Sequence, residues 1–192
     1  MLVDRVLVDA NCLHKLYLRN LLLTLADCEL IELRWSQEII VETIRSLVKR
    51  FPNKSASVTY RLNSLNHHFR ESLVIDYEYL VGKLGCRDKT DEHVLAAAIH
   101  SQSKYLLTFN VSDFPKEAQV TYGVEIVDPD IFLLMLADRD EQAFLATCAV
   151  WLTHFKLPEF NAVEAAKAIR IAGCEAFSEW LSERAELLDR LL

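Results

Sequence analysis

Apolar residues recur along this chain in two alternating patterns: short runs typical of buried strands, and longer stretches with helical spacing. The short runs lie at residues 5–10, 31–35, 104–109 and 123–128, with a weaker one at 74–77. Helical spacing follows most of them, and Ser36 stands where it can cap the helix that follows the second run. Strands that alternate with helices predict an α/β fold with a mostly parallel sheet and helices on both faces.

Beyond residue 137 the pattern contains helices only. Two helical stretches are expected at 140–155 and 162–192, and aromatic residues such as Trp151 and Trp180 give them a packing surface. No linker-like Ser, Gly or Pro-rich segment interrupts the chain. We therefore expect an α/β domain over residues 1–137, with residues 138–192 as a helical extension that packs on the same unit.

Composition and charge limit the functional classes to which this protein can belong. The net charge of −7 argues against a protein that coats nucleic acid through a general basic surface, but it does not exclude a nuclease whose carboxylates bind metal. The five scattered cysteines form no C-x-x-C pair, so free thiols are expected. Because Asp4, Arg5 and Asp9 interrupt the first apolar run and no stretch suits a membrane span, we expect a cytoplasmic protein without membrane contact.

Acidic residues gather where the predicted strands end. Asp9 follows the first strand, Asn110 and Asp113 follow the strand at 104–109, and Asp91 begins the helix before that strand. Ligands of such sheets bind beyond the carboxyl ends of the strands. Carboxylate oxygens suit Mg²⁺ or Mn²⁺, and gathered carboxylates repel one another unless a cation or a raised pKa relieves them. The pattern favours a metal site able to activate water against a phosphodiester.

Each acid also has a simpler interpretation. Asp9 could cap the helix that follows it, and Asp88 and Asp91 could stand at a helix start only because acids are favoured there. Glu42 lies inside a helix, where a solvated side chain is the simpler expectation. His93 has a second histidine seven residues further along its helix but no third ligand at suitable spacing, so a contact with the core or a partner is expected. Only the combination of acids favours function.

Four segments resemble, in order, the signature segments of the PIN-domain family of metal-dependent ribonucleases, which includes VapC-like toxins. They read VLVDAN, WSQEIIVETIR, DKTDEHVLAAAIH and LLTFNVSDFP, within residues 3–136. The resemblance implies that the catalytic acids are Asp9, Glu42, Asp91 and Asp113. Of these, Asp9, Asp91 and Asp113 would be the metal ligands, and the accessory residues would be Asp88 and Asn110.

The resemblance also carries expectations for the whole protein. It implies a three-layer α/β/α nuclease domain over residues 1–137, Mg²⁺ or Mn²⁺ as cofactor, and an endoribonuclease that hydrolyses RNA. The protein would be the toxin of a type II toxin–antitoxin pair, bound by a cognate antitoxin, and a homodimer. The helical extension at 138–192 exceeds a minimal domain of this family.

Two other interpretations stay open from the sequence. The first is a non-catalytic protein-interaction module that keeps the fold and uses its helical extension to bind a partner. The second is a phosphorylated receiver-type domain, which also places aspartates at strand ends. The receiver interpretation ranks last, because Asp4 and Asp9 are not adjacent and no lysine follows the strand at 104–109 directly.

Overall fold

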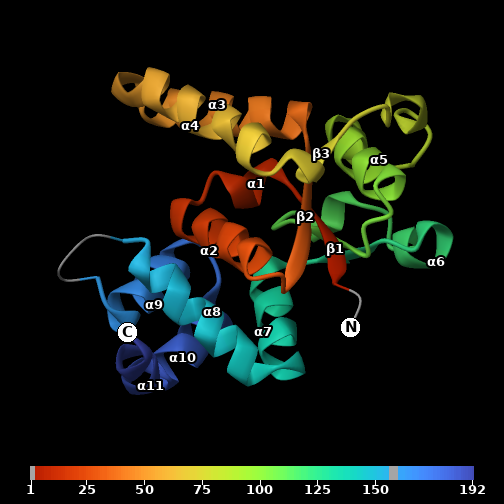
Figure 1. The fold of residues 1–192 in the computed structure, drawn as a ribbon. Helices are drawn as coiled ribbons and strands as arrows, with labels where there is room; N and C mark the ends of the chain where they lie inside the picture. Colours follow the sequence, from red (N-terminus) through yellow and green to blue (C-terminus); the bar gives the residue numbers. More distant parts are fainter. Residues whose placement is uncertain (1–2, 156–159) are drawn as a thin grey trace. The chain divides into compact units, whose positions relative to one another are not determined.

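The computed structural model describes residues 3–155 and 160–192, which form two compact units (Figure 1). The first unit contains the residues up to His14 and those of Ile31–Val127, and the second contains Lys15–Leu30 and Asp128–Leu192. Within the described residues, no helix is long and apolar enough to cross a membrane. The predicted boundary after residue 137 stays a prediction.

A sheet of five parallel strands forms the centre of the first unit. Its order is β3-β2-β1-β4-β5, and the strands are β1 (Asp4–Val8), β2 (Ile31–Ser36), β3 (Leu73–Val74), β4 (Tyr105–Leu107) and β5 (Glu125–Val127). Val6 on the central strand lies opposite Leu33 of β2 and Tyr105 of β4. Since every pair is parallel, the chain leaves β1 and β4 at the same edge of the sheet, with Asp9 and Thr108.

Five helices accompany this sheet, and two of them form a hairpin. They are α1 (Ala10–Leu13), α3 (Gln37–Arg50), α4 (Ser55–His68), α5 (Glu92–His100) and α6 (Ala118–Tyr122). The α5 helix packs on β1, β2 and β4, and its buried alanines allow a close approach. As predicted, Ser36 caps α3, because its side chain accepts a hydrogen bond from the Ile39 N–H. Helices α3 and α4 lie side by side (Figure 1), and the Trp35 indole reaches Asn66 of α4 at 2.8 Å.

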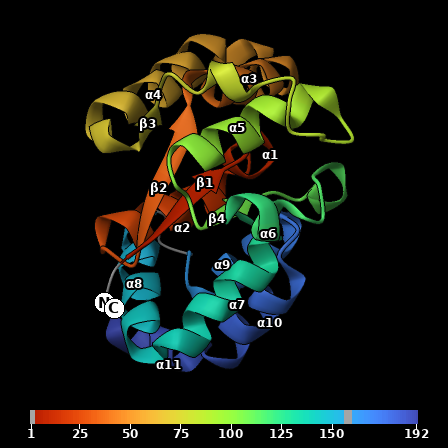
Figure 2. The same ribbon diagram turned by 90° about the vertical axis from the view of Figure 1, so that its right-hand side faces the viewer.

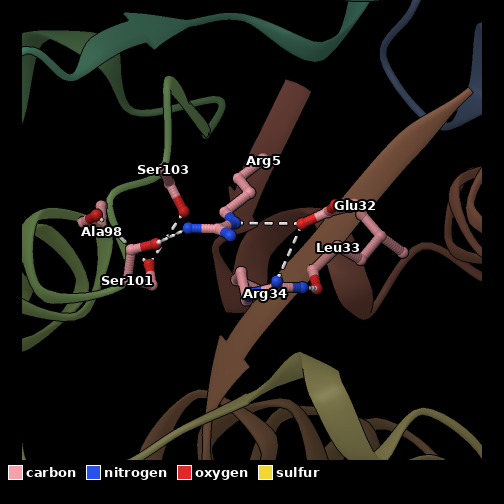
Figure 3. A network of polar contacts seen from close by, with 7 residues as sticks. All are labelled: Arg5, Glu32, Leu33, Arg34, Ala98, Ser101 and Ser103. Carbon is pink, nitrogen blue, oxygen red and sulfur yellow. Dashed lines mark hydrogen bonds and ion pairs between the residues drawn. The ribbon is translucent and has the colours of Figure 1, made fainter. Parts of the chain in front are cut away.

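Three charged side chains on β1 and β2 pair with one another. The carboxylate of Glu32 on β2 accepts from Arg5 of β1 at 3.0 Å and from Arg34 at 2.9 Å (Figure 3). Arg5 also reaches the Ser101 carbonyl at the end of α5. These contacts tie the C-terminal end of α5 to the two strands and compensate both guanidinium groups.

The second unit is helical. Its elements are α2 (Leu16–Asp27), α7 (Pro129–Arg139), α8 (Glu141–Thr153), α9 (Ala162–Ile171), α10 (Glu175–Glu183) and α11 (Ala185–Leu191), which Figure 2 shows from a second side. Phe144 of α8 and Phe177 of α10 meet edge to face, with ring centroids 5.7 Å apart. Asp130 of α7 accepts hydrogen bonds from the backbone N–H groups that begin α10.

The predicted fold class, a parallel α/β sheet with flanking helices and additional C-terminal helices, is confirmed. The differences lie where elements begin and end: the weak strand expected at 74–77 is the shorter β3 at Leu73–Val74. The stretch 162–192 forms three helices instead of one, and Gly173, at φ +100°, separates the first two. The sequence EYLVGKLG at residues 78–85 predicts a short helix, but within these described residues only the 3-10 turn Glu78–Leu80 forms, because Gly82 and Gly85 adopt positive φ and turn the chain.

Candidate active site

Asp9 stands at the carboxyl end of β1, with 6% of its surface exposed. It occupies the cap position of α1, yet its side chain makes no capping hydrogen bond. Its carboxylate instead accepts from the Thr108 hydroxyl at 2.8 Å and from the Asn11 amide at 2.7 Å. Burial raises the pKa of Asp9, and the hydrogen bonds from the Thr108 hydroxyl and the Ala10 backbone only partly offset that rise. Helix capping therefore does not account for this buried carboxylate.

Thr108, which the sequence analysis did not single out, joins the ends of β1 and β4. Its hydroxyl donates to Asp9 and accepts from the Asn11 amide at 2.8 Å and the Asn110 backbone N–H at 3.0 Å. Asn11 also accepts from the Phe109 N–H at 3.2 Å. A polar residue at the end of an otherwise apolar run was the signal available for Thr108.

Asp91 stands at the start of α5, where its side chain makes no capping hydrogen bond. Its pKa is raised from 3.8 to about 6, first by burial and then by the negative charges of Asp9, Asp88, Asp113 and Glu42. All five carboxylates therefore lie close enough for their charges to interact. Segments distant in the sequence meet at this edge of the sheet.

The two accessory candidates differ in how their side chains are used. Asp88 is exposed, and its carboxylate accepts from the backbone N–H and the hydroxyl of Thr90 at 2.9 and 2.7 Å, which lowers its pKa. The capping interpretation thus accounts for Asp88. Asn110 is exposed, and it links the strand end to the following turn through its backbone: its carbonyl accepts from the Asp113 N–H at 3.0 Å.

Backbone hydrogen bonds hold the two loops that carry Asp91 and Asp113. Asp113 is half-buried, and its carbonyl accepts from the Arg87 N–H at 2.8 Å, which joins the loop after β4 to the loop before α5. The buried Glu92 carboxylate accepts from the N–H groups of Gly82 and Gly85. The loop before α5 is thus fixed at both ends.

Glu42 of α3 contacts His93 of α5. Its Oε1 lies 3.2 Å from Nε2 of His93, and Oε2 of Glu38 lies 3.6 Å from the other ring nitrogen. Burial alone would lower the pKa of His93, but the Glu42 carboxylate, followed by Glu38 and Asp9, raises it on balance. Neither ring nitrogen makes a well-aligned hydrogen bond to a described group. We regard the contact as an ion pair that places His93 between two glutamates of α3.

The donor set suits a hard divalent cation, since it consists of carboxylate oxygens. Burial and mutual repulsion raise the pKa of both Asp9 and Asp91, and a bound cation would relieve that repulsion. Among residues 3–155 and 160–192, no group of three or more His, Cys, Asp or Glu side chains is drawn close enough to hold a metal ion. The carboxylates are thus close enough for their charges to interact, but no three of them lie close enough to hold one metal ion.

Three comparisons with known proteins bear on this site. Residues 5–112, more than half of the chain, match a family model described as PIN domain. A protein named "Putative ribonuclease VapC50", from Mycobacterium tuberculosis, is 40% identical over 71 residues, which are 37% of this chain and 42% of that protein. The chain therefore matches less than half the length of this relative. No solved structure matches.

Proposed function

Because the chain belongs to the PIN domain family, we propose that it is a ribonuclease that hydrolyses RNA phosphodiester bonds with a bound Mg²⁺ or Mn²⁺ ion. The observation that carries the proposal is the state of Asp91. This carboxyl is left without a capping role, and burial, followed by the charges of surrounding acids, raises its pKa to about 6. A fold that only needed a helix cap would gain nothing from gathering these charges.

In this proposal Asp9, Asp91 and Asp113 hold the metal, and Glu42 is the fourth catalytic acid. A bound divalent ion supplies polarisation of a phosphoryl oxygen and a more acidic water. Thr108 fixes the orientation of the Asp9 carboxylate through its 2.8 Å hydrogen bond. Asp88 and Asn110 lie beside this set as accessory residues.

The direct test is cleavage of a fluorescent single-stranded RNA in Mn²⁺, Mg²⁺ or EDTA. We expect cleavage that depends on metal and falls at least about 100-fold in Asp9→Asn, because loss of a direct ligand costs more than the 10- to 100-fold typical of an outer-shell change. Asp140→Asn is the matched control: Asp140 caps α8 in the second unit, and asparagine caps equally well. A folded protein that cleaves none of a varied set of RNAs in either metal would refute the proposal.

We further propose that the protein is the toxin of a type II toxin–antitoxin pair in the cytoplasm, active as a homodimer and bound by a cognate antitoxin. The similarity to a relative named as VapC50 supports this assignment. Induced expression should arrest growth of a bacterial host, and Asp9→Asn should abolish the arrest. Normal growth with active, well-expressed protein would contradict the toxin role but leave the ribonuclease proposal standing.

A further inference from the structure

The hairpin of α3 and α4 has a charge unlike the rest of the chain. Residues 43–70, called here the basic arm, contain six Lys and Arg residues and no Asp or Glu. The cations are Arg45, Lys49, Arg50, Lys54, Arg61 and Arg70. Since the whole chain carries −7, the residues outside the basic arm carry −13. Although the net charge of the whole chain is negative, the basic arm itself is strongly positive.

The cations of the basic arm are exposed and lack acidic partners. All six lie at exposed positions, and no described carboxylate approaches any of them within 4.0 Å. The contrast within the same unit is clear, because Arg5 and Arg34 on the sheet share the carboxylate of Glu32. Six exposed cations without an ion-pair partner among the described carboxylates repel one another and favour an anionic partner.

The basic arm follows directly after Glu42 on α3. Glu38, Glu42, Arg45 and Lys49 follow one another at intervals of three or four residues, so they lie along one stripe of α3. The two glutamates face His93 of α5, which places the start of that stripe at the acidic edge. Lys49 lies seven residues beyond Glu42, roughly 10 Å along the axis at 1.5 Å per residue. The stripe thus runs from carboxylates directly into cations.

Exposed aromatic rings accompany these charges. Phe51, at the end of α3, is 43% exposed, and Tyr60 on α4 is 76% exposed. The guanidinium of Arg50 lies 5.4 Å from the centre of the Phe51 ring. Proteins bind single-stranded nucleic acid through cations that contact the phosphates and aromatic rings that stack on the bases.

We propose that the basic arm binds the phosphate backbone of single-stranded RNA and leads the strand to the acidic site. The identity of the polyanion as RNA rests on the proposed function. The competing occupants, an acidic protein or a second copy of this chain, would be attracted by the charges but would not require exposed rings among them. The inference assigns substrate binding to residues outside the carboxylate cluster.

Binding is measured with the full chain carrying Asp9→Asn, in EDTA, so that no RNA is cut. Affinity for a fluorescent single-stranded RNA is followed against salt, because the slope of log K against log salt is about −0.7 per phosphate neutralised on a single strand. Arg45→Ala with Lys49→Ala should reduce that slope by about 1.4 and weaken binding on the order of tenfold at low salt. Lys167→Ala with Arg190→Ala removes the same charges from exposed positions of the second unit and should change neither quantity.

A second variant separates stacking from charge. Tyr60→Ala should weaken binding by about tenfold while the salt slope stays unchanged, because stacking on a base involves no counterion release. Val120→Ala alters an equally exposed apolar residue outside the basic arm and should bind like the parent protein. Far-UV circular dichroism and thermal unfolding would establish that each variant keeps its fold.

Three results would overturn the inference: no RNA binding by the parent protein, equal losses in the arm and control variants, or unchanged RNA binding with loss of a dimer in the arm variant. The last would identify a second copy as the occupant. Failure of the proposed function is distinguishable. RNA bound through the basic arm but never cleaved with metal would refute the nuclease, whereas cleavage and binding that ignore the basic arm would refute only this inference.

Discussion

Two aspartates at helix starts, one in each unit, have opposite surroundings. In the helical unit, the Asp130 carboxylate accepts from the backbone N–H groups of Phe177 at 2.7 Å and Ala176 at 2.9 Å, at the beginning of α10. In the sheet unit, Asp91 stands at the beginning of α5 and accepts no capping bond, while burial and then nearby acids raise its pKa to about 6. The first charge is compensated by the fold, whereas the second has no capping partner and is the one we propose as a metal ligand.

Asp88 shows that the difference is local. It lies three residues from Asp91, yet its carboxylate is compensated by Thr90 and its pKa is lowered, not raised. Burial without a compensating hydrogen bond at Asp91, and hydrogen bonding to the ionised form at exposed Asp88, therefore separate a candidate ligand from a structural acid. Three experiments can break or sharpen this contrast.

The largest effect is expected on cleavage. Asp91→Asn should reduce metal-dependent RNA cleavage at least about 100-fold, because it removes a proposed ligand charge. Asp88→Asn should reduce it no more than a few-fold, because Asp88 is already used by Thr90. Initial rates at saturating Mn²⁺ would measure both. Equal losses in the two variants would break the contrast and make Asp88 a ligand in its own right.

An intermediate effect is expected on stability. Asp130→Ala leaves two N–H groups at the start of α10 without their acceptor and should cost about 2 kcal/mol, a fall of about 4–8 °C in the melting temperature. Thermal unfolding followed by circular dichroism measures this fall. Asp138→Ala, which removes an exposed acid from the same helix, should leave the melting temperature almost unchanged. Similar melting temperatures for both variants would show that the two hydrogen bonds do not stabilise the unit.

Much of the fold could be predicted because its signals are local. Buried parallel strands such as β1 and β4 form nearly continuous apolar runs, and Ser36 marks a helix start by its own chemistry. The strand order depends on pairings between distant segments, which no local pattern specifies. The break between α9 and α10 depends on Gly173 and its left-handed backbone, whereas the apolar spacing of the two helices continues across it.

The candidate site could be outlined but not completed from the sequence. Strand ends indicated Asp9 and Asp113, whereas Thr108 gains its role only from Asp9, 99 residues away. His93 likewise depends on the glutamates of α3. Asp88 and Asp91 could not be distinguished, because both precede a helix and only the hydrogen bonds separate them. The basic arm could not be recognised from the net charge of the chain, because the acids outside residues 43–70 outweigh its six cations.

The smallest effect concerns the stability of the protein without metal. Because the folded pKa of Asp91 is about 6, above its ordinary 3.8, the folded state binds this proton more tightly and loses stability as pH rises through that range. Asp91→Asn should therefore raise the melting temperature at pH 7.5 in EDTA and not at pH 4. Solvent screening of this half-exposed group limits the gain to below about 1 kcal/mol, or about 1–3 °C. Added Mn²⁺ should reverse the order by stabilising only the parent protein. A variant less stable than the parent at pH 7.5 in EDTA would mean that Asp91 is compensated after all, as Asp130 is.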